Sequence, residues 1–155
     1  MLATRLITTL SLALILLGSN PIHSRAEDSN SKVVDNVLIY LGVMPGEMLS
    51  NLPAGDEEKV MHGGIPSDKG IYHIMIALFD AKTSERISDA EISASTSEFG
   101  MARESKKLEP MKIADTVTFG NFFKFKGNGS FRLDLSIRIP GRSGQIKARF
   151  DYSNE

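Results

Sequence analysis

The chain has 155 residues, with 18 Lys and Arg against 19 Asp and Glu, which gives a formal charge of −1 at pH 7. This length predicts a single domain. The absence of Cys excludes a disulfide framework, a thiolate metal site and a cysteine nucleophile. The balanced charge argues against nucleic-acid binding. No nucleophile elbow, phosphate loop or dinucleotide fingerprint occurs, so we do not expect an enzyme.

The first 26 residues have the pattern of a cleaved signal peptide. Arg5 forms a short basic region, and residues 6–17 are a 12-residue apolar run, which is too short to span a bilayer as a helix. Small residues at Ser24 and Ala26 predict cleavage after Ala26. We therefore expect a periplasmic or secreted protein with no membrane span in the mature chain.

Residues 27–32 are polar and predict a disordered lead-in to one domain over residues 33–155. Residues 33–43 are rich in β-branched side chains and predict the first strand. Residues 44–49 predict one helical turn, with Pro45 at its first position, where the missing N–H costs nothing. Residues 50–69 are rich in Gly and Pro and predict a long surface loop.

The middle of the chain predicts further short strands. Residues 71–80 form an apolar second strand, residues 82–86 a polar turn, and residues 87–97 a third strand. Residues 98–107 predict a loop, followed by a short extended piece over 108–113 whose Pro110 favours a sheet edge. Residues 116–125 predict a strand in which Gly120 marks a bulge.

The last two strands show the clearest pattern. Apolar and polar residues alternate strictly over 131–139 and again over 146–152, which predicts one face on a core and one in water. About seven short strands with Gly and Pro turns, and no long helix, predict an all-β fold. The expected architecture is an antiparallel immunoglobulin-like β-sandwich.

A family resemblance covers residues 71–152. Its features are Phe79-Asp80-Ala81 at the end of a strand, Asp89-Ala90 before the next, a Gly-Ser-Phe-Arg strand at residues 129–132, and a closing Pro-Gly turn. In these features the chain resembles the small exported YtkA-like and FixH-like domains. The resemblance implies a small sandwich of a kind associated with copper handling or cytochrome oxidase assembly. The chain departs from FixH-like proteins in lacking their single-pass anchor.

The predicted mature chain contains two histidines and six methionines, and their placement suggests a metal site. Met61 and His62 are adjacent in the Gly-rich loop, while His73 and Met75 are two apart on the second strand. Residues two apart in a strand point to the same face. His73 and Met75 therefore share one face with Ala77 and Phe79, and the alternate residues, beginning at Tyr72, face the core.

The face that carries His73 is too apolar to be left in water, so we expect residues 44–62 to cover it. Folding that segment over the strand brings His62 towards His73, with Met44 or Met48 nearby and Met111 within reach. Thioether and imidazole donors suit Cu(I), and a pair of imidazoles also suits Cu(II). The predicted ligands of a copper ion are His62, His73, Met75, Met61 and Met111.

A second hypothesis stands beside copper binding. Methionines on apolar faces usually fill gaps in a core, and a histidine on a strand is often a hydrogen-bonded structural residue. Under this second hypothesis, the protein is an adaptor that docks on a periplasmic or membrane complex through its apolar second strand and the Phe-rich segment 119–125. The two hypotheses are compatible, because a copper-delivery protein must also dock on a protein partner. The acidic residues 56–58 predict a solvated tip.

Overall fold

A computed structural model describes residues 30–51, 53, 61–98, 101–113, 115–127 and 129–153, so the predicted leader and residues 27–29 of the lead-in lie outside it. Residues 31 and 32, which were expected to be disordered, belong to the first strand. The described elements are β1 (Ser31–Val34), β2 (Val37–Pro45), α1 (Gly46–Ser50), η1 (Met61–Gly63), β3 (Ile71–Asp80), β4 (Glu91–Ser97), β5 (Glu104–Ile113), β6 (Thr116–Lys124), β7 (Phe131–Arg138) and β8 (Ile146–Tyr152). Neither helix among them is long and apolar enough to cross a membrane.

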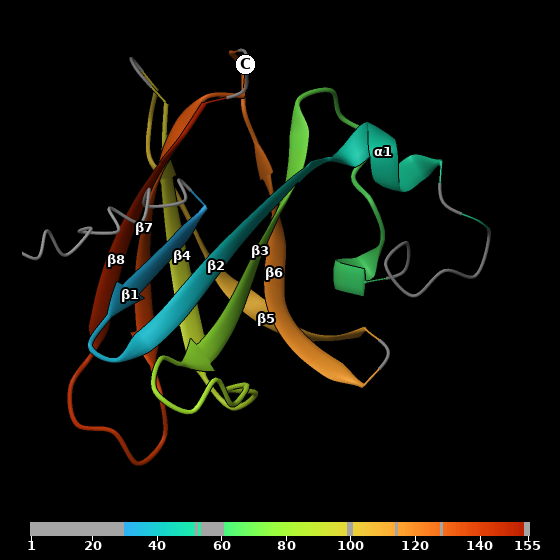
Figure 1. Ribbon diagram of the computed structural model, residues 1–155. Helices are drawn as coiled ribbons and strands as arrows, with labels where there is room; N and C mark the ends of the chain where they lie inside the picture. Colours follow the sequence, from blue (N-terminus) through green and yellow to red (C-terminus); the bar gives the residue numbers. More distant parts are fainter. Residues whose placement is uncertain are drawn as a thin grey trace, which may run out of the picture.

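The strands form two packed layers that are joined by one shared strand (Figure 1). Every neighbouring pair in the order β1-β2-β3-β6-β5-β4-β7-β8 is antiparallel. The first half of β5 pairs with β4, and its second half pairs with β6. Apart from β1, the layers β2-β3-β6-β5 and β4-β7-β8 have the strand order of an immunoglobulin constant-type sandwich. The predicted fold class is confirmed, with eight strands in the described residues.

The core lies between the layers and is built from alternate residues of the strands. Its fully buried members include Ile39, Ile74, Ile76, Leu78, Phe119, Phe123, Leu133, Ile137 and Phe150. Burying a side chain of this size stabilises the fold by roughly 1.5–3 kcal/mol relative to leaving it exposed. Strand β1, at the edge of the first layer, approaches β8, at the edge of the second. The Lys32 ammonium lies 5.4 Å from the centre of the Phe150 ring.

The N-terminal strand prediction was wrong in one respect. Residues 33–43 were expected to form one strand, but the structure has a hairpin, with Val34 paired to Val37 across a two-residue turn. Asp35 and Asn36 have φ angles of 47° and 62°. Two successive positive φ angles match the twist of the flanking strands, and Asp and Asn tolerate them. The apolar residues on both sides concealed this turn.

The segment before Leu108 also differs from the prediction. Residues 98–107 were expected to be a loop, but β5 begins at Glu104, and β4 begins at Glu91 rather than at residue 87. The first half of β5 carries mostly polar and charged residues, so it lacks the apolar alternation that indicates a strand. Pro110 lies in the half of β5 that pairs only with β6, as a residue without an N–H requires.

Gly120 does not mark a bulge, contrary to the prediction. Its register is continuous on both sides, opposite Met75 of β3 and Glu109 of β5. A Cβ atom at this position would lie 2.7 Å from the Met111 methyl group and 2.9 Å from His73 Nε2. The glycine therefore allows two side chains from neighbouring strands to approach the backbone of β6.

Candidate metal site

The outer face of the β2-β3-β6 layer is covered by the segment that follows β2. Helix α1 and the short helix η1 both lie beside this layer (Figure 1). Leu49 of α1 is fully buried and packs against Ile71 and Phe122, with Met44 and Ile65 at the edge of this cluster. The expectation that residues 44–62 would cover the face of His73 is confirmed for the described part of that segment.

His73 is buried completely and has no hydrogen-bond partner. Its ring stacks on Phe122 with the centroids 4.7 Å apart, and neither ring nitrogen is bonded within the described part of the chain. Leaving a buried polar group unpaired costs about 1–3 kcal/mol. Burial, and secondarily the neighbouring His62, lowers the pKa of His73 to about 4. The imidazole is therefore neutral at pH 7, with a lone pair on one nitrogen.

His62 reaches the same place from η1. It has a φ angle of 56°, and Gly63 and Gly64 follow with φ angles of 81° and 98°, so the chain turns sharply here. The His62 side chain is only 5% exposed, with Nδ1 2.8 Å from the Glu109 carboxylate and Nε2 3.0 Å from Met111 Sδ. A carboxylate and a thioether sulfur both only accept hydrogen bonds, so each contact is a hydrogen bond when the ring nitrogen that faces it carries a proton.

The separation of the two imidazoles suits a shared ion. Their ring centroids are 5.4 Å apart, with the planes inclined at 63°. A metal–nitrogen bond is about 2 Å and the centroid lies about 1 Å behind the nitrogen, so two imidazoles on one metal have centroids roughly 4–6 Å apart. The observed distance lies within that range without any movement of the backbone.

The structure places the predicted sulfur donors differently from one another. Met111 is 2% exposed and contacts His62, and its methyl group lies over Gly120 near His73. Met75 shares the face of His73, but its methyl group lies over Gly42 on the β2 side. Met61 immediately precedes His62 in η1, and its side chain lies outside the described part of the structure. His62, His73 and Met111 are therefore the predicted residues that the fold brings together.

Glu109 is a member of the site that the sequence analysis did not select. It is two residues before Met111 on β5, so both side chains point to the same face. A carboxylate that accepts from the second nitrogen of a histidine is the usual partner of a metal-ligating imidazole. No group of three or more His, Cys, Asp or Glu side chains among the described residues is arranged to hold a metal ion. A metal at this place would accordingly need thioether donors.

The fold and this site define a class: a small immunoglobulin-like β-sandwich with two imidazoles and a thioether enclosed on one face. No protein-family model and no curated protein match the chain. Solved structures are similar to it. They include a DUF4426 family protein from Pseudomonas aeruginosa (TM-score 0.57, 6% identity, 79% of this chain and 94% of the other) and a copper-bound variant of FetP from uropathogenic Escherichia coli (TM-score 0.57, 15% identity, 81% and 95%).

A third similar structure is a copper-bound variant of P19 from Campylobacter jejuni, with a TM-score of 0.55, 13% identity and coverage of 79% of this chain and 94% of that one. At these identities the likeness concerns the fold. It supports the class of small β-sandwich proteins and does not extend to the YtkA-like and FixH-like families that the sequence resembles.

Proposed function

We propose that the protein binds one copper ion between His62, His73 and Met111. The observation that carries this proposal is His73, an imidazole with no solvent exposure and no hydrogen-bond partner among the described residues, next to a second imidazole and a thioether sulfur. Such a group is costly to keep unless a ligand uses it. Copper is favoured because thioether and imidazole donors suit Cu(I), and copper-bound forms of the similar proteins FetP and P19 support this choice.

Each residue has a distinct role in the proposed site. Glu109 holds Nδ1 of His62, which fixes the ring so that Nε2 faces the sulfur of Met111. His73 is neutral at pH 7, so the ion does not have to displace a proton from it. Met75 and Met61 stay predicted donors from the sequence and are not among the residues that the described structure brings together. Bound copper would supply a soft Lewis acid enclosed by apolar side chains.

A competition titration with Cu(I) and Cu(II), each against a chelator, tests this proposal. We expect one ion per protein and no such binding in the His62→Ala, His73→Ala double variant. Met111→Leu should weaken Cu(I) more than Cu(II), because it removes the soft donor alone. Met48→Leu is the matched control, since Met48 is 59% exposed on α1. Unchanged affinity in the double histidine variant would refute the site.

We also propose that the protein is exported and acts by binding and delivering copper rather than by catalysis. The leader pattern of residues 1–26 supports export. The intact mass of the protein recovered from a periplasmic or secreted fraction should correspond to a chain that begins at Glu27. A mass that retains residues 1–26, in a cytosolic fraction, would contradict this.

Docking on a protein partner is the second candidate function. The Phe-rich segment 119–125 that was expected to dock is not available for it, because its four phenylalanines are buried, but exposed apolar residues on β1 and β2 favour docking there. Val33 is 61% exposed and Tyr40 is 43% exposed, and Tyr40 packs edge-on against Phe79. Aromatic residues at such positions commonly anchor interfaces. A photocrosslinker in place of Tyr40 should capture a discrete partner in the native cell, and an equal yield from one placed at Lys126 would count against this surface.

A further inference from the structure

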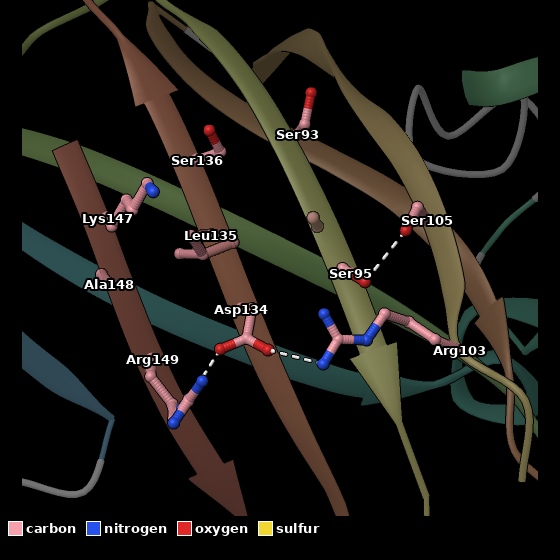
Figure 2. Close-up of a pocket in the computed structure, with 11 residues that line it drawn as sticks. Ser93, Ser95, Arg103, Ser105, Asp134, Leu135, Ser136, Lys147, Ala148 and Arg149 are labelled. Atoms are coloured by element: carbon pink, nitrogen blue, oxygen red, sulfur yellow. Dashed lines mark hydrogen bonds and ion pairs between the residues drawn. The ribbon is translucent and has the colours of Figure 1, made fainter. Parts of the chain in front are cut away.

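The outer face of the second layer carries a polar groove on the side of the sandwich away from the imidazoles. The groove has a volume of about 530 Å³ and lies across β4, β7 and β8, with the start of β5 at its rim (Figure 2). Its side chains form two transverse rows in the strand register. One row contains Ser93, Ser136 and Lys147, and the next contains Ser105, Ser95, Asp134 and Arg149.

The groove holds more positive than negative charge. Asp134 lies between two arginines, with one carboxylate oxygen 2.6 Å from Arg149 Nε and the other 3.4 Å from an Arg103 Nη atom. Lys147 also lines the groove and forms no ion pair with any other described residue. Among the lining residues, one carboxylate against three cations gives a charge of about +2, on a chain whose overall formal charge is −1. Just outside the lining, Asp151 also acts electrostatically on Arg149.

The guanidinium groups keep donors available after pairing with Asp134. Each guanidinium has five N–H donors in a fixed plane, and Arg149 and Arg103 each direct one nitrogen at Asp134. The shared carboxylate holds the two side chains close to each other, which reduces the rotamer entropy lost when they grip a ligand. The arrangement is therefore suited to accept a second, external anion.

Hydroxyl groups supply the remaining hydrogen-bonding capacity. Ser95 and Ser105 bond to each other at 2.9 Å, and Ser93 lies directly opposite Ser136 in the register. None of the described lining residues is aromatic, so the groove offers no flat surface on which a sugar ring could stack. Hydroxyl and guanidinium donors without an aromatic platform favour an oxyanion over a neutral saccharide.

We propose that this groove binds a small ligand with two or three carboxylate or phosphate groups, through Arg103, Arg149 and Lys147, with Ser93 and Ser136 as additional donors. This inference does not rest on copper binding. The groove lies on the opposite layer from His62 and His73, so a ligand there does not touch the copper donors.

Titration of the full-length, copper-free protein with citrate and, separately, with pyrophosphate tests the proposal. The citrate arm reports on carboxylate ligands and the pyrophosphate arm on phosphate ligands. We expect saturable one-to-one binding of at least one probe, and a loss of about tenfold in affinity in the Arg103→Gln, Arg149→Gln double variant. Arg142→Gln is the matched control, because Arg142 also forms an ion pair, with Asp80, outside the groove.

A serine variant distinguishes binding at a specific site, with defined hydrogen bonds, from nonspecific attraction of an anion to positive charge. Ser93→Ala with Ser136→Ala leaves the charge unchanged and should weaken binding about two- to fivefold, through the loss of two neutral hydrogen bonds. Backbone amide NMR shifts should change on β4, β7 and β8. Equal weakening by Arg142→Gln and by the groove variants, or no saturable binding of either probe, would overturn the proposal.

Discussion

The two outer faces of the sandwich are built from the same kind of strand and have opposite chemistry. The face of β2-β3-β6 lies beneath α1 and η1, and it holds an imidazole that is fully buried and has no hydrogen-bond partner in the part of the chain that the structure describes. The face of β4-β7-β8 is open to water, and its charged side chains pair with one another at the rim of a groove. One face hides soft donors from solvent, and the other presents hard donors to it.

The difference teaches what a covering segment does to a sheet. On the open face, water screens the ion pairs and can hydrogen-bond to the hydroxyl groups. Substitutions there therefore change the free energy of unfolding little. Beneath α1 and η1, a polar atom that lacks a protein partner has no water to replace it. Its protonation, and any change of volume beside it, therefore alters the free energy of unfolding. Three predictions sharpen this comparison, in order of expected effect.

The largest effect should be a loss of stability in mild acid. Unfolded His73 takes up a proton below pH 6.5, whereas folded His73 does so only below a pKa of about 4. The free energy of unfolding of the copper-free protein should therefore fall by about 3 kcal/mol as the pH drops from 6.5 to 4, and level off below. Urea denaturation at several pH values measures this.

His73→Leu is the control for that prediction, because leucine is of similar volume and cannot titrate. Its free energy of unfolding at pH 7 should be at least that of the wild type and up to about 1–2 kcal/mol higher, because two unpaired nitrogens are removed. Its acid-dependent loss should be smaller than that of the wild type. Identical pH profiles for the two proteins would contradict the assignment of the transition to His73.

The second prediction concerns Gly120. Gly120→Ala should lower the free energy of unfolding by about 1–3 kcal/mol, because the new methyl group overlaps His73, the Met111 methyl group and the Ile74 carbonyl oxygen. Gly42→Ala is the matched control in the same register row, where the nearest atom is the flexible end of Met75 at 3.2 Å. Thermal and urea denaturation compare them, and equal losses would show that Gly120 has no special role.

The smallest effect should come from the open face. Asp134→Asn removes the carboxylate shared by Arg103 and Arg149, whose pairs with it are exposed to water. The free energy of unfolding should change by less than about 1 kcal/mol. The pKa of Arg149, which Asp134 raises, should return towards its ordinary value. A loss as large as that in Gly120→Ala would mean that the two faces do not differ as described.

Much of the fold could be predicted because alternation reports directly on a half-buried strand. The pattern over 131–139 and 146–152 predicted β7 and β8 almost to the residue. The β1–β2 turn was missed because Asp35 and Asn36 interrupt an apolar run without Gly or Pro. The start of β5 was missed because none of its residues before Leu108 is apolar: Ser105 and Lys107 are exposed, and Lys106 donates to the Phe122 carbonyl oxygen and pairs with Glu104.

For the candidate site, the sequence could predict only the face of the sheet on which each residue lies. Spacing placed His73 on an apolar outer face, and the need to cover that face brought His62 to it. Spacing could not show that Met75 turns towards β2 while Met111 approaches from β5, because that depends on which strands are neighbours. Glu109 was overlooked for the same reason: its partner lies 47 residues away in the chain.

The shared strand β5 has a consequence for how the chain tolerates insertions. Its odd-numbered residues point outward along its whole length, so Ser105 belongs to the groove and Glu109 and Met111 belong to the imidazole face. Side chains alternate with a period of two, so one residue inserted after Leu108 would reverse one half of the strand relative to the other. Met111 would then turn to the side on which the exposed residues Pro110 and Lys112 now lie, away from His62, while Ser105 stayed in place. The number of residues in β5 thus determines that Ser105 faces the groove while Glu109 and Met111 face the imidazoles.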